Sequence, residues 1–304
     1  MGFAGDRQSG STSVAAGFLE DLERWLATDR SPSGPALRGA LLAWLRDAQR
    51  EQPSMALVHQ LAARALAIAD AALAREDVVA DLRSHLAASC ASEREDLAAA
   101  TRAAARTAAD LVTQPGAWIA TLSMSGMVLE ALRELRRRGR GPRVLLAESR
   151  PKLEGRVMAA ALAAEGIPVW LVADAALPML VQQAAAVWLG ADAVTELGVL
   201  NKIGSYTLAL AAREHGVAVH AIATRRKLVP AGTPALGIAE MPPAEIWDAP
   251  PEGVRPRNVY FEIVPLELLR GVVVEDEVLG PTEIAVAVAD RALPDELAAA
   301  LPGS

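Results

Sequence analysis

The sequence predicts an α/β protein in which an N-terminal helical domain precedes a domain built on a mainly parallel sheet. Three observations lead to this prediction. The first third repeats apolar residues at helical spacing, the part after Gln114-Pro115-Gly116 alternates short apolar runs with helices, and glycines recur between a helix and the next run. We therefore expect two domains, residues 1–114 and residues 115–304.

The N-terminal helices are predicted by apolar periodicity and by the breakers between them. Apolar residues three and four apart occur in residues 18–26 and again in residues 37–45, with a Pro- and Gly-rich turn at 31–35 between them. The turn at 52–54 ends the second helix, and its serine can cap a third. A further Ala-rich helix is expected over residues 93–112.

The second domain is predicted to contain six short strands, each an apolar run of about three to seven residues, as buried strands often are. They span residues 118–122, 144–147, 169–172, 187–189, 217–223 and 272–274. Gly139, Gly166 and Gly216 each follow a predicted helix and precede a strand, where a left-handed helix end favours glycine. The Pro- and Gly-rich residues 225–258 are expected to form a long loop over the crevice.

Composition limits the possible functions. The chain has 52% hydrophobic residues and a net charge of −7, so it can bury a large core and lacks the basic face typical of nucleic-acid binding. Its one cysteine, Cys90, excludes an internal disulfide and suits a cytoplasmic protein. Residues up to Val14 do not resemble a secretory signal and are expected to fray. No apolar run predicts a membrane span, and no motif predicts a metal or a cofactor.

Polar clusters follow three of the predicted strands. The sequence ESRPKLEG follows residues 144–147, a GAD turn occupies residues 190–192, and NKIGS occupies residues 201–205. In doubly wound sheets, ligands bind outside the carboxyl ends of the strands, so these clusters are expected to meet in one crevice. The clusters therefore predict a single binding site.

Arg150 and Asp192 are the charged candidates in the first two clusters. Pro151 in the first turn of a helix leaves backbone N–H groups free to bind an anion together with Arg150. The alternative is a capped helix with a solvated arginine. Asp192 follows a strand, where burial can shift its pKa and suit it to proton transfer. Alternatively, its carboxylate bonds the amides of its own turn.

Two lysines follow later strands. Asn201 and Lys202 precede a helix that Ser205 can start, so an amide, an ammonium and helix N–H groups suit a phosphate or sugar hydroxyls. Lys227 follows another strand. A lysine is more often a solvated surface residue, and this alternative stays open for both lysines.

The ordered set ESRPKLEG, LGADAV, NKIGSYTLALAA and FEIVPLELLRGVVVEDEVLGPTEI resembles a known superfamily. It comprises the α, β and δ regulatory subunits of eukaryotic translation initiation factor 2B, with methylthioribose-1-phosphate isomerase and ribose-1,5-bisphosphate isomerase. The resemblance covers nearly all of the second domain and implies a Rossmann-like fold for it. It also implies self-association, most simply as a homodimer.

In the isomerase branches, the resemblance implies conversion of an aldose 1-phosphate to its ketose by proton transfer involving a Cys and an Asp. Asp192 matches the Asp, and Ser123 stands where the Cys is expected. An alkanol is a far weaker acid than a thiol, whose pKa is about 8.5. Gln52 replaces an Arg that would clamp a phosphate, and Glu154 replaces a Gln, which adds negative charge. The expected ligand-binding set is Gln52, Ser125, Arg150, Glu154, Asn201, Lys202 and Lys227.

Two functions of different classes follow. In the first, the chain is a sugar or sugar-phosphate isomerase with altered specificity, in which Asp192 transfers the proton and Ser123 only hydrogen-bonds. In the second, it is a noncatalytic ligand-sensing or assembly protein that resembles the initiation-factor subunits, which also lack the catalytic Cys. Both imply a small sugar- or nucleotide-like ligand and self-association, without nucleic acid or membrane.

Overall fold

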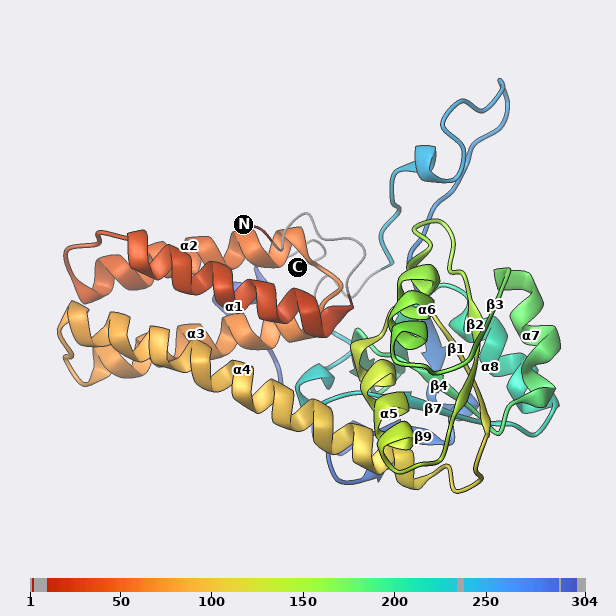
Figure 1. The fold of residues 1–304 in the computed structure, drawn as a ribbon. Coiled ribbons are helices and arrows are strands. Elements are labelled where there is room, and N and C mark those ends of the chain that lie inside the picture. Colours follow the sequence, from red (N-terminus) through yellow and green to blue (C-terminus); the bar gives the residue numbers. More distant parts are fainter. Residues whose placement is uncertain (1, 3–9, 234–237, 290, 300–304) are drawn as a thin grey trace.

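The structure is a computed structural model that describes residue 2 and residues 10–233, 238–289 and 291–299. An elongated helical domain lies beside a domain with a seven-stranded sheet, as Figure 1 shows. The predicted α/β class with N-terminal helices and a mainly parallel sheet is therefore confirmed.

The helical domain is built from four long helices. They are α1 (Ser11–Thr28), α2 (Gly34–Glu51), α3 (Ala56–Ala74) and α4 (Val79–Asp110). Helix α4 begins at Val79 and not at residue 93 as expected. Its first half was not recognised in the sequence because that half buries only a narrow apolar stripe. Leu82, Leu86 and Cys90 lie four residues apart on that stripe, and polar residues between them obscure the pattern.

Helix α4 connects the two cores. Its first half packs in the helical core, whereas Ala104 and Ala108 pack near its end against α5 (Gly126–Arg137), beside the sheet. In the opposite direction, the short helix α10 (Asp295–Ala298) returns to the helical domain, where Leu297 is buried. The domain boundary at residue 114 stays a prediction.

By length and composition, α3 is the one helix among the described residues that could cross a membrane. In this fold, 56% of its most apolar stretch is buried, and Leu57, Leu61 and Leu66 pack within the helical core. Its role as a core helix accounts for its apolar composition.

The large sheet has the order β10-β9-β7-β4-β1-β2-β3, and all neighbours are parallel except β10, which runs antiparallel to β9. The strands are β1 (Trp118–Leu122), β2 (Arg143–Ala147), β3 (Val169–Val172), β4 (Ala186–Leu189), β7 (Ala218–Ile222), β9 (Gly271–Val273) and β10 (Val278–Leu279). The six predicted strands are confirmed to within two residues at each end. Gly139, Gly166 and Gly216 have φ of 71°, 68° and 67°, as their predicted helix-end role requires.

Helices cover both faces of this sheet. Helices α4, α5 and α6 (Glu154–Ala164) pack on one face, where Ile119 of β1 is buried, and α7 (Leu177–Leu180) and α8 (Ser205–Glu214) pack on the other, where Ala120 is buried. Strands covered on both faces read as continuous apolar runs. The carboxyl ends of the strands therefore remain the open place for a site.

A second, three-stranded antiparallel sheet was not predicted. It consists of β5 (Ala193–Thr195), β6 (Gly198–Lys202) and β8 (Phe261–Pro265). Asn201 and Lys202 thus lie in a strand and not in a loop before α8. A three-residue strand and a strand with a polar end give little periodicity in sequence.

The chain between β7 and β8 forms an arm (residues 238–258) that projects away from the α/β domain (Figure 1). Its base is closed by a 2.8 Å hydrogen bond from Met241 N–H to the Asn258 carbonyl. The long loop expected over the crevice lies over it only at this base. The remaining helices are α9 (Pro281–Ala289) and the 3₁₀ turns η1 (Asp174–Ala176), η2 (Val181–Gln183), η3 (Arg225–Lys227), η4 (Pro243–Glu245) and η5 (Leu266–Leu268).

Candidate functional site

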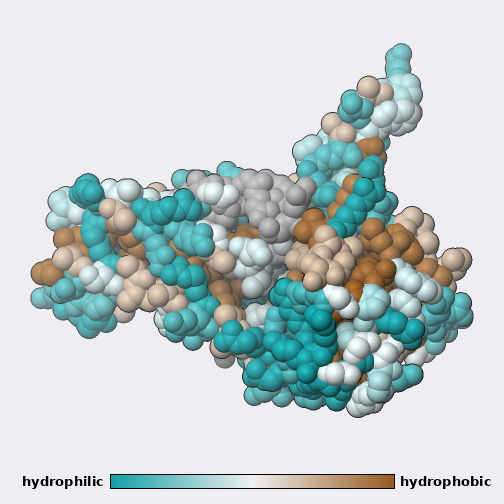
Figure 2. All heavy atoms as spheres, in the orientation of Figure 1, coloured by the Kyte–Doolittle hydropathy of each residue, from teal (hydrophilic) through white to brown (hydrophobic). Residues whose placement is uncertain are grey.

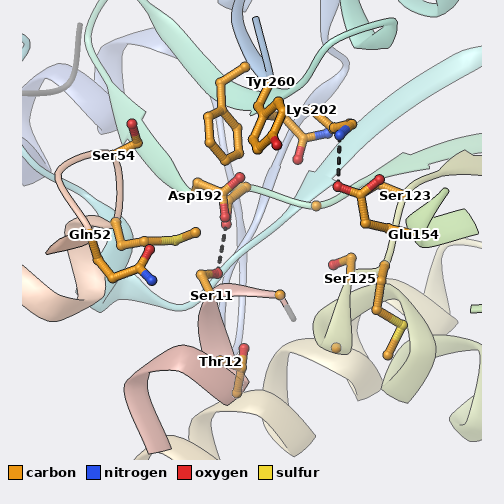
Figure 3. Close-up of a pocket in the computed structure, with 18 of the residues that line it drawn as sticks. Ser11, Thr12, Gln52, Ser54, Ser123, Ser125, Glu154, Asp192, Lys202 and Tyr260 are labelled. Carbon is orange, nitrogen blue, oxygen red and sulfur yellow. Dashed lines mark hydrogen bonds and ion pairs between the residues drawn. The ribbon is translucent and has the colours of Figure 1, made fainter. Parts of the chain in front are cut away.

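A pocket lies where the carboxyl ends of β1, β2 and β4 meet the start of α1 (Figure 3). It brings together all of the predicted site residues except Arg150. These are Gln52, Ser123, Ser125, Glu154, Asp192, Asn201, Lys202 and Lys227. The three polar clusters therefore converge as expected, while the role of each residue stays a prediction.

Asp192 is buried at the turn between β4 and β5. Its carboxylate accepts a hydrogen bond from Ser11, drawn in Figure 3, rather than from the amides of its own turn. Lys227 is also buried, and its Nζ donates to Ser11 Oγ at 2.7 Å and to the Ala191 carbonyl at 2.6 Å. Lys227, Ser11 and Asp192 thus form a continuous hydrogen-bonded chain.

Burial shifts the titration of both ends of this chain. It raises the pKa of Asp192 above its ordinary value, and the nearby charge of Lys227 and the hydrogen bond from Ser11 oppose this change. Burial lowers the pKa of Lys227 to about 8, against the attraction of Asp192. Both groups therefore exchange protons closer to neutrality than they would in water.

Lys202 is buried, not solvated as a lone lysine usually is. Its Nζ donates to Glu154 Oε1 at 2.7 Å and lies 4.8 Å from the centre of the Tyr260 ring. Glu154 Oε2 is buried and has no hydrogen-bond partner in the part of the chain that the structure describes. This carboxylate thus neutralises Lys202, while its second oxygen stays buried.

Gly190 allows the pocket walls to approach closely. A Cβ on Gly190 would lie 2.7 Å from Ser125 Oγ and 3.4 Å from Asn201 Oδ1. Asn201 is fixed by its Nδ2, which donates to Ser205 Oγ at 2.8 Å. A side chain at position 190 would therefore force apart the two polar walls.

Ser123 lies directly after β1 in a left-handed conformation, with φ of 64°. Its N–H donates to Ser149 Oγ at 2.7 Å, and Ser149 is itself left-handed, with φ of 65°. Such conformations are costly for non-glycine residues and often mark functional sites.

The sole cysteine, Cys90, lies in the helical core, where burial raises the pKa of its thiol to about 11.

Arg150 does not face the crevice as expected, because it is exposed and does not line the pocket. The N–H groups of Ser149 and Arg150 donate to the Asp174 carboxylate at 2.7 and 2.8 Å. Helix α6 begins at Glu154 and not at Pro151, after Leu153 in the left-handed region. The anion site expected here is thus filled by the protein's own carboxylate.

The start of α8 is also occupied. The N–H groups of Gly204 and Tyr206 donate to Glu262 Oε1 at 2.7 and 2.9 Å. The phosphate expected at this helix end would have to displace a carboxylate. Asn201 and Lys202 therefore reach the pocket without the N-terminus of α8.

The start of α1 was not predicted, because the residues up to Val14 were expected to fray. Ser11 is buried, and Gly10, Ser11 and Thr12 line the pocket. A Cβ on Gly10 would lie 2.8 Å from the Met124 carbonyl, so only glycine lets α1 begin beside the start of α5. The available signal was Gly-Ser-Thr-Ser before an apolar helical repeat, which is typical of a helix start.

Two helix N-termini therefore face one pocket, with Ser125 capping α5 through a 3.4 Å hydrogen bond from the Val128 N–H. The first N–H groups of a helix have no acceptor within the helix, and its N-terminus carries a partial positive charge. Together with Lys227, this end of the pocket suits an anion.

Gln52 lines the opposite wall, in a turn that a buried histidine holds in place. His59 Nε2 donates to the Pro53 carbonyl at 2.8 Å, and its Nδ1 accepts from Gln49 Nε2 at 3.1 Å. Burial lowers the pKa of His59, which keeps the ring neutral for these two bonds.

Among the described residues, no group of three or more His, Cys, Asp or Glu side chains is arranged to hold a metal ion.

Comparison with known proteins connects this site to a family. The model of the Initiation factor 2 subunit family matches residues 7–281. A putative translation initiation factor eIF-2B subunit 2-like protein of Pyrococcus furiosus is 36% identical over 166 residues, which are 54% of this chain and 58% of that protein. A methylthioribose-1-phosphate isomerase of Oleidesulfovibrio alaskensis is 37% identical over 153 residues, 46% of this chain and 43% of that protein. The chain thus matches about half the length of these relatives.

Solved structures extend the likeness along most of the chain. The Pyrococcus horikoshii translation initiation factor eIF-2B superposes with a TM-score of 0.77 and 26% identity, covering 92% of this chain and 94% of that one. The 5-methylthioribose 1-phosphate isomerase of P. horikoshii has a TM-score of 0.75 at 22% identity, covering 92% and 83%, and shows that the fold is shared.

Proposed function

The chain belongs to the Initiation factor 2 subunit family, and from this membership we propose that its pocket binds a small phosphorylated sugar and interconverts the aldose and ketose forms. One observation carries the proposal: Asp192 is buried in the same pocket as Lys202 and Lys227. A carboxylate poised for proton transfer beside two cations suits a substrate that carries negative charge and develops more during the reaction.

The phosphate is proposed to lie at the N-termini of α1 and α5. Ser11, Thr12 and Gly126 line this end, and the charge of Lys227 lies behind Ser11. Helix N-termini bind phosphate through free N–H groups and the helix dipole, and no arginine clamp is needed. The anion therefore has a place although Gln52 stands where an arginine was expected.

The proposed reaction opens the ring of an aldose 1-phosphate and moves one hydrogen. The bond between C1 and the ring oxygen breaks, and its electron pair stays on the ring oxygen, which takes up a proton. Asp192 removes the C2 proton, and the C–H electron pair becomes the C1–C2 double bond. The C2 hydroxyl then gives up its proton and becomes a carbonyl, while a proton returns to C1. Asp192 supplies one exchange group. Ser123 stands where a second group is expected but only hydrogen-bonds, because an alkanol is a weak acid, so the remaining proton transfers depend on solvent and are slow.

Relatives support this substrate class by name, since they include a methylthioribose-1-phosphate isomerase and a 5-deoxyribose 1-phosphate isomerase. The test is to incubate the protein with ribose, 5-deoxyribose and methylthioribose 1-phosphates and follow ketose formation by NMR. We expect slow conversion that Asp192→Asn abolishes. Equal traces of ketose with wild type and Asp192→Asn would reject catalysis.

A second function, ligand sensing without turnover, is favoured by Ser123. The only thiol of the sequence lies in the helical core, and relatives include proteins named as initiation factor subunits. Calorimetry distinguishes the two functions. Saturable heat with chemically unchanged ligand supports sensing, whereas no binding of any sugar phosphate would reject both.

We also propose that the chain forms a homodimer through the arm and the nearby edge of the sheet. The arm exposes Ile246 and Trp247, and the edge strand β3 exposes Trp170 and Leu171. Figure 2 shows apolar surface on the α/β domain near the base of the arm. A protein of shared fold is described as a tetrameric eIF2B complex from C. thermophilum, which supports assembly through this fold.

A further inference from the structure

The turn η3, which carries Lys227 to the pocket, is held by side chains from distant parts of the chain. The Arg225 N–H donates to both oxygens of the Glu275 carboxylate, at 3.0 and 3.1 Å. The Arg225 carbonyl accepts from Arg291 Nη1 at 2.6 Å. The backbone of the first residue of the turn is thus fixed, and the middle residue, Arg226, is held through its side chain.

Glu93 of α4 is the partner of Arg226. The Glu93 side chain is 5% exposed, and its two carboxylate oxygens form ion pairs with Arg64 Nε and Arg226 Nη1. Asp96 Oδ2, also in α4, lies 3.5 Å from Arg226 Nη2. Glu93 therefore connects α3 and α4 of the helical domain to the turn that carries Lys227.

The packing of α4 does not require a carboxylate at position 93. Cys90 and Leu97 are buried three residues before it and four residues after it, so Glu93 lies on the apolar stripe of the helix. Well-packed apolar side chains are often as stabilising as a buried ion pair of similar volume. The contribution of this carboxylate is therefore the direction that it imposes on Arg226.

Arg226 and Lys227 are adjacent in the turn, but their side chains reach different neighbours. Arg226 reaches α4, whereas Lys227 Nζ donates to Ser11 Oγ at 2.7 Å and to the Ala191 carbonyl at 2.6 Å. Lys227 lines the pocket, and Arg226 and Glu93 lie outside its lining. Because a turn of three residues cannot move one of them alone, release of Arg226 would also let the ammonium of Lys227 shift.

We propose that Glu93 is a positioning residue for Lys227: its ion pair with Arg226 fixes η3, and η3 fixes the ammonium at the pocket. The proposal rests on the proposed function, because it assumes that a ligand with a phosphate binds beside this ammonium. It also assigns a form of regulation. A movement of α4 relative to the sheet would displace Arg226 and change the affinity of the pocket through Lys227.

Calorimetry with ribose 1-phosphate and thermal melting test the proposal in Glu93→Leu. Leucine suits the apolar stripe, and Arg64 and Arg226 can turn to solvent, since their side chains are 59% and 25% exposed. We expect a melting temperature at or above that of wild type. The affinity should nevertheless be about three- to tenfold lower. A purely structural role of Glu93 predicts the reverse, a lower melting temperature with unchanged affinity.

A double-mutant cycle connects this loss to Lys227. Lys227→Met keeps a long unbranched side chain without the charge, and adding Glu93→Leu to it should cause no further loss of affinity. Arg226→Gln removes the same ion pair from a partly exposed position and should reproduce the effect of Glu93→Leu. This variant keeps the test decisive if Glu93→Leu does not fold.

Glu23→Gln is the matched control. Glu23 pairs with Arg94, the residue after Glu93, at 2.7 and 2.8 Å, and this ion pair joins α4 to α1 and not to η3. It should keep the wild-type affinity. Wild-type affinity in folded Glu93→Leu or Arg226→Gln, or an equal loss with and without Lys227, would overturn the role of Glu93 and leave the proposed function standing. Failure of wild type to bind ribose 1-phosphate or methylthioribose 1-phosphate would overturn both.

Discussion

The hydroxyl of Ser123 limits how fast protons can move in the pocket. Asp192 has a buried carboxylate with a raised pKa, but the reaction needs a second group that can exchange a proton. Ser123 has the right place, directly after β1, and a backbone conformation fixed by Ser149. Ser123 lacks an acidic proton. In the proposed reaction, the oxygen atom that stands here in place of a sulfur therefore decides between slow catalysis and binding without turnover.

Replacement of that atom tests this statement. We expect Ser123→Cys to raise the rate of ketose formation from a sugar 1-phosphate by about tenfold or more, since general acid–base groups contribute about 10²–10⁴-fold. The rate is measured by NMR under saturating substrate. Ser125→Cys, in the same loop and pocket, is the control and should show no gain. Tight binding by Ser123→Cys without faster turnover would favour the sensing function.

Lys227 gives the pocket a dependence on pH. Burial lowers the pKa of Lys227 to about 8, so its charge is present below pH 8 and lost above it. A phosphate, with a second pKa of about 6, stays a dianion in this range. We expect calorimetric affinity for a sugar phosphate to fall between pH 7 and 9 in wild type. Lys227→Arg, which stays charged, should show a flat profile.

The contribution of Lys227 to the free energy of unfolding should change in the opposite direction to the affinity, over an overlapping pH range. The unfolded chain binds the Lys227 proton up to its ordinary pKa of 10.5, so it holds more protons than the folded chain between about pH 8 and 10.5. The contribution of Lys227 to the free energy of unfolding therefore rises with pH in this window. A fall of both affinity and this contribution would show that Lys227 is not the group that titrates.

Part of the pocket could be predicted from the residues themselves, because polar groups at the ends of parallel strands meet at one edge of the sheet, whereas Gln52, Ser123 and Glu154 were assigned from the family resemblance. Asp192, Lys202 and Lys227 were all assigned in this way. The anion site predicted at Arg150 was wrong because the Asp174 carboxylate, distant in the sequence, accepts the N–H groups of Ser149 and Arg150. The Gly-Ser-Thr-Ser signal could have placed the start of α1, but its contact with the loop before α5 is a tertiary one that no local pattern reveals.

Among the elements, α6 contributes most to the precision of the site. Glu154 reaches the pocket because α6 packs closely against the end of β2. This packing requires glycine at position 155, since a side chain there would collide with the backbone of β2. The sequence predicted β2 and a following helix, since buried parallel strands and amphipathic helices have distinct periods. It did not predict the exact start of α6, because Leu153 adopts a left-handed conformation that glycine would normally mark.

Substitution of Gly155 tests that packing. We expect Gly155→Ala to lower the free energy of unfolding by about 2 kcal/mol or more, because the new Cβ would collide with the backbone of β2. Urea unfolding measures the effect. Gly39→Ala is the control: Gly39 lies within α2 with nothing within 4 Å of the added Cβ, so this change should stabilise by about 0.5–1 kcal/mol. Equal effects would show that α6 can shift.

The pocket belongs to the molecule as a whole. The end proposed for the phosphate includes the start of α1 in the helical domain, the proposed proton-transfer group follows β4, and α4 packs in both cores. A change in the angle between the domains would therefore move Ser11 relative to Asp192. This arrangement suits both an enzyme that excludes water and a sensor that couples ligand binding to assembly.

In the proposed homodimer, the arm links the pocket to the second copy of the chain. Met241 and Tyr260, at its base, line the pocket, and Glu245 within it pairs with Lys152 at 2.6 Å. Farther out, the adjacent Ile246 and Trp247 are 42% and 49% exposed, and a contiguous apolar patch of this kind is typical of an interaction surface. A second copy of the chain is the partner that the proposed homodimer supplies.

Trp247→Asp should therefore convert a dimer to a monomer without unfolding the protein, because a charge at the interface would be buried without a partner. Sedimentation velocity over about 1–100 µM measures this change, since weak homodimers dissociate in that range. Val286→Asp is the control, because Val286 is 72% exposed on α9 and lies outside the arm and β3. A monomeric wild type at the highest concentration, or dissociation by both variants alike, would contradict an interface built on the arm.

If sugar phosphate strengthens the wild-type dimer but not a Met241→Ala dimer, the base of the arm couples the pocket to assembly.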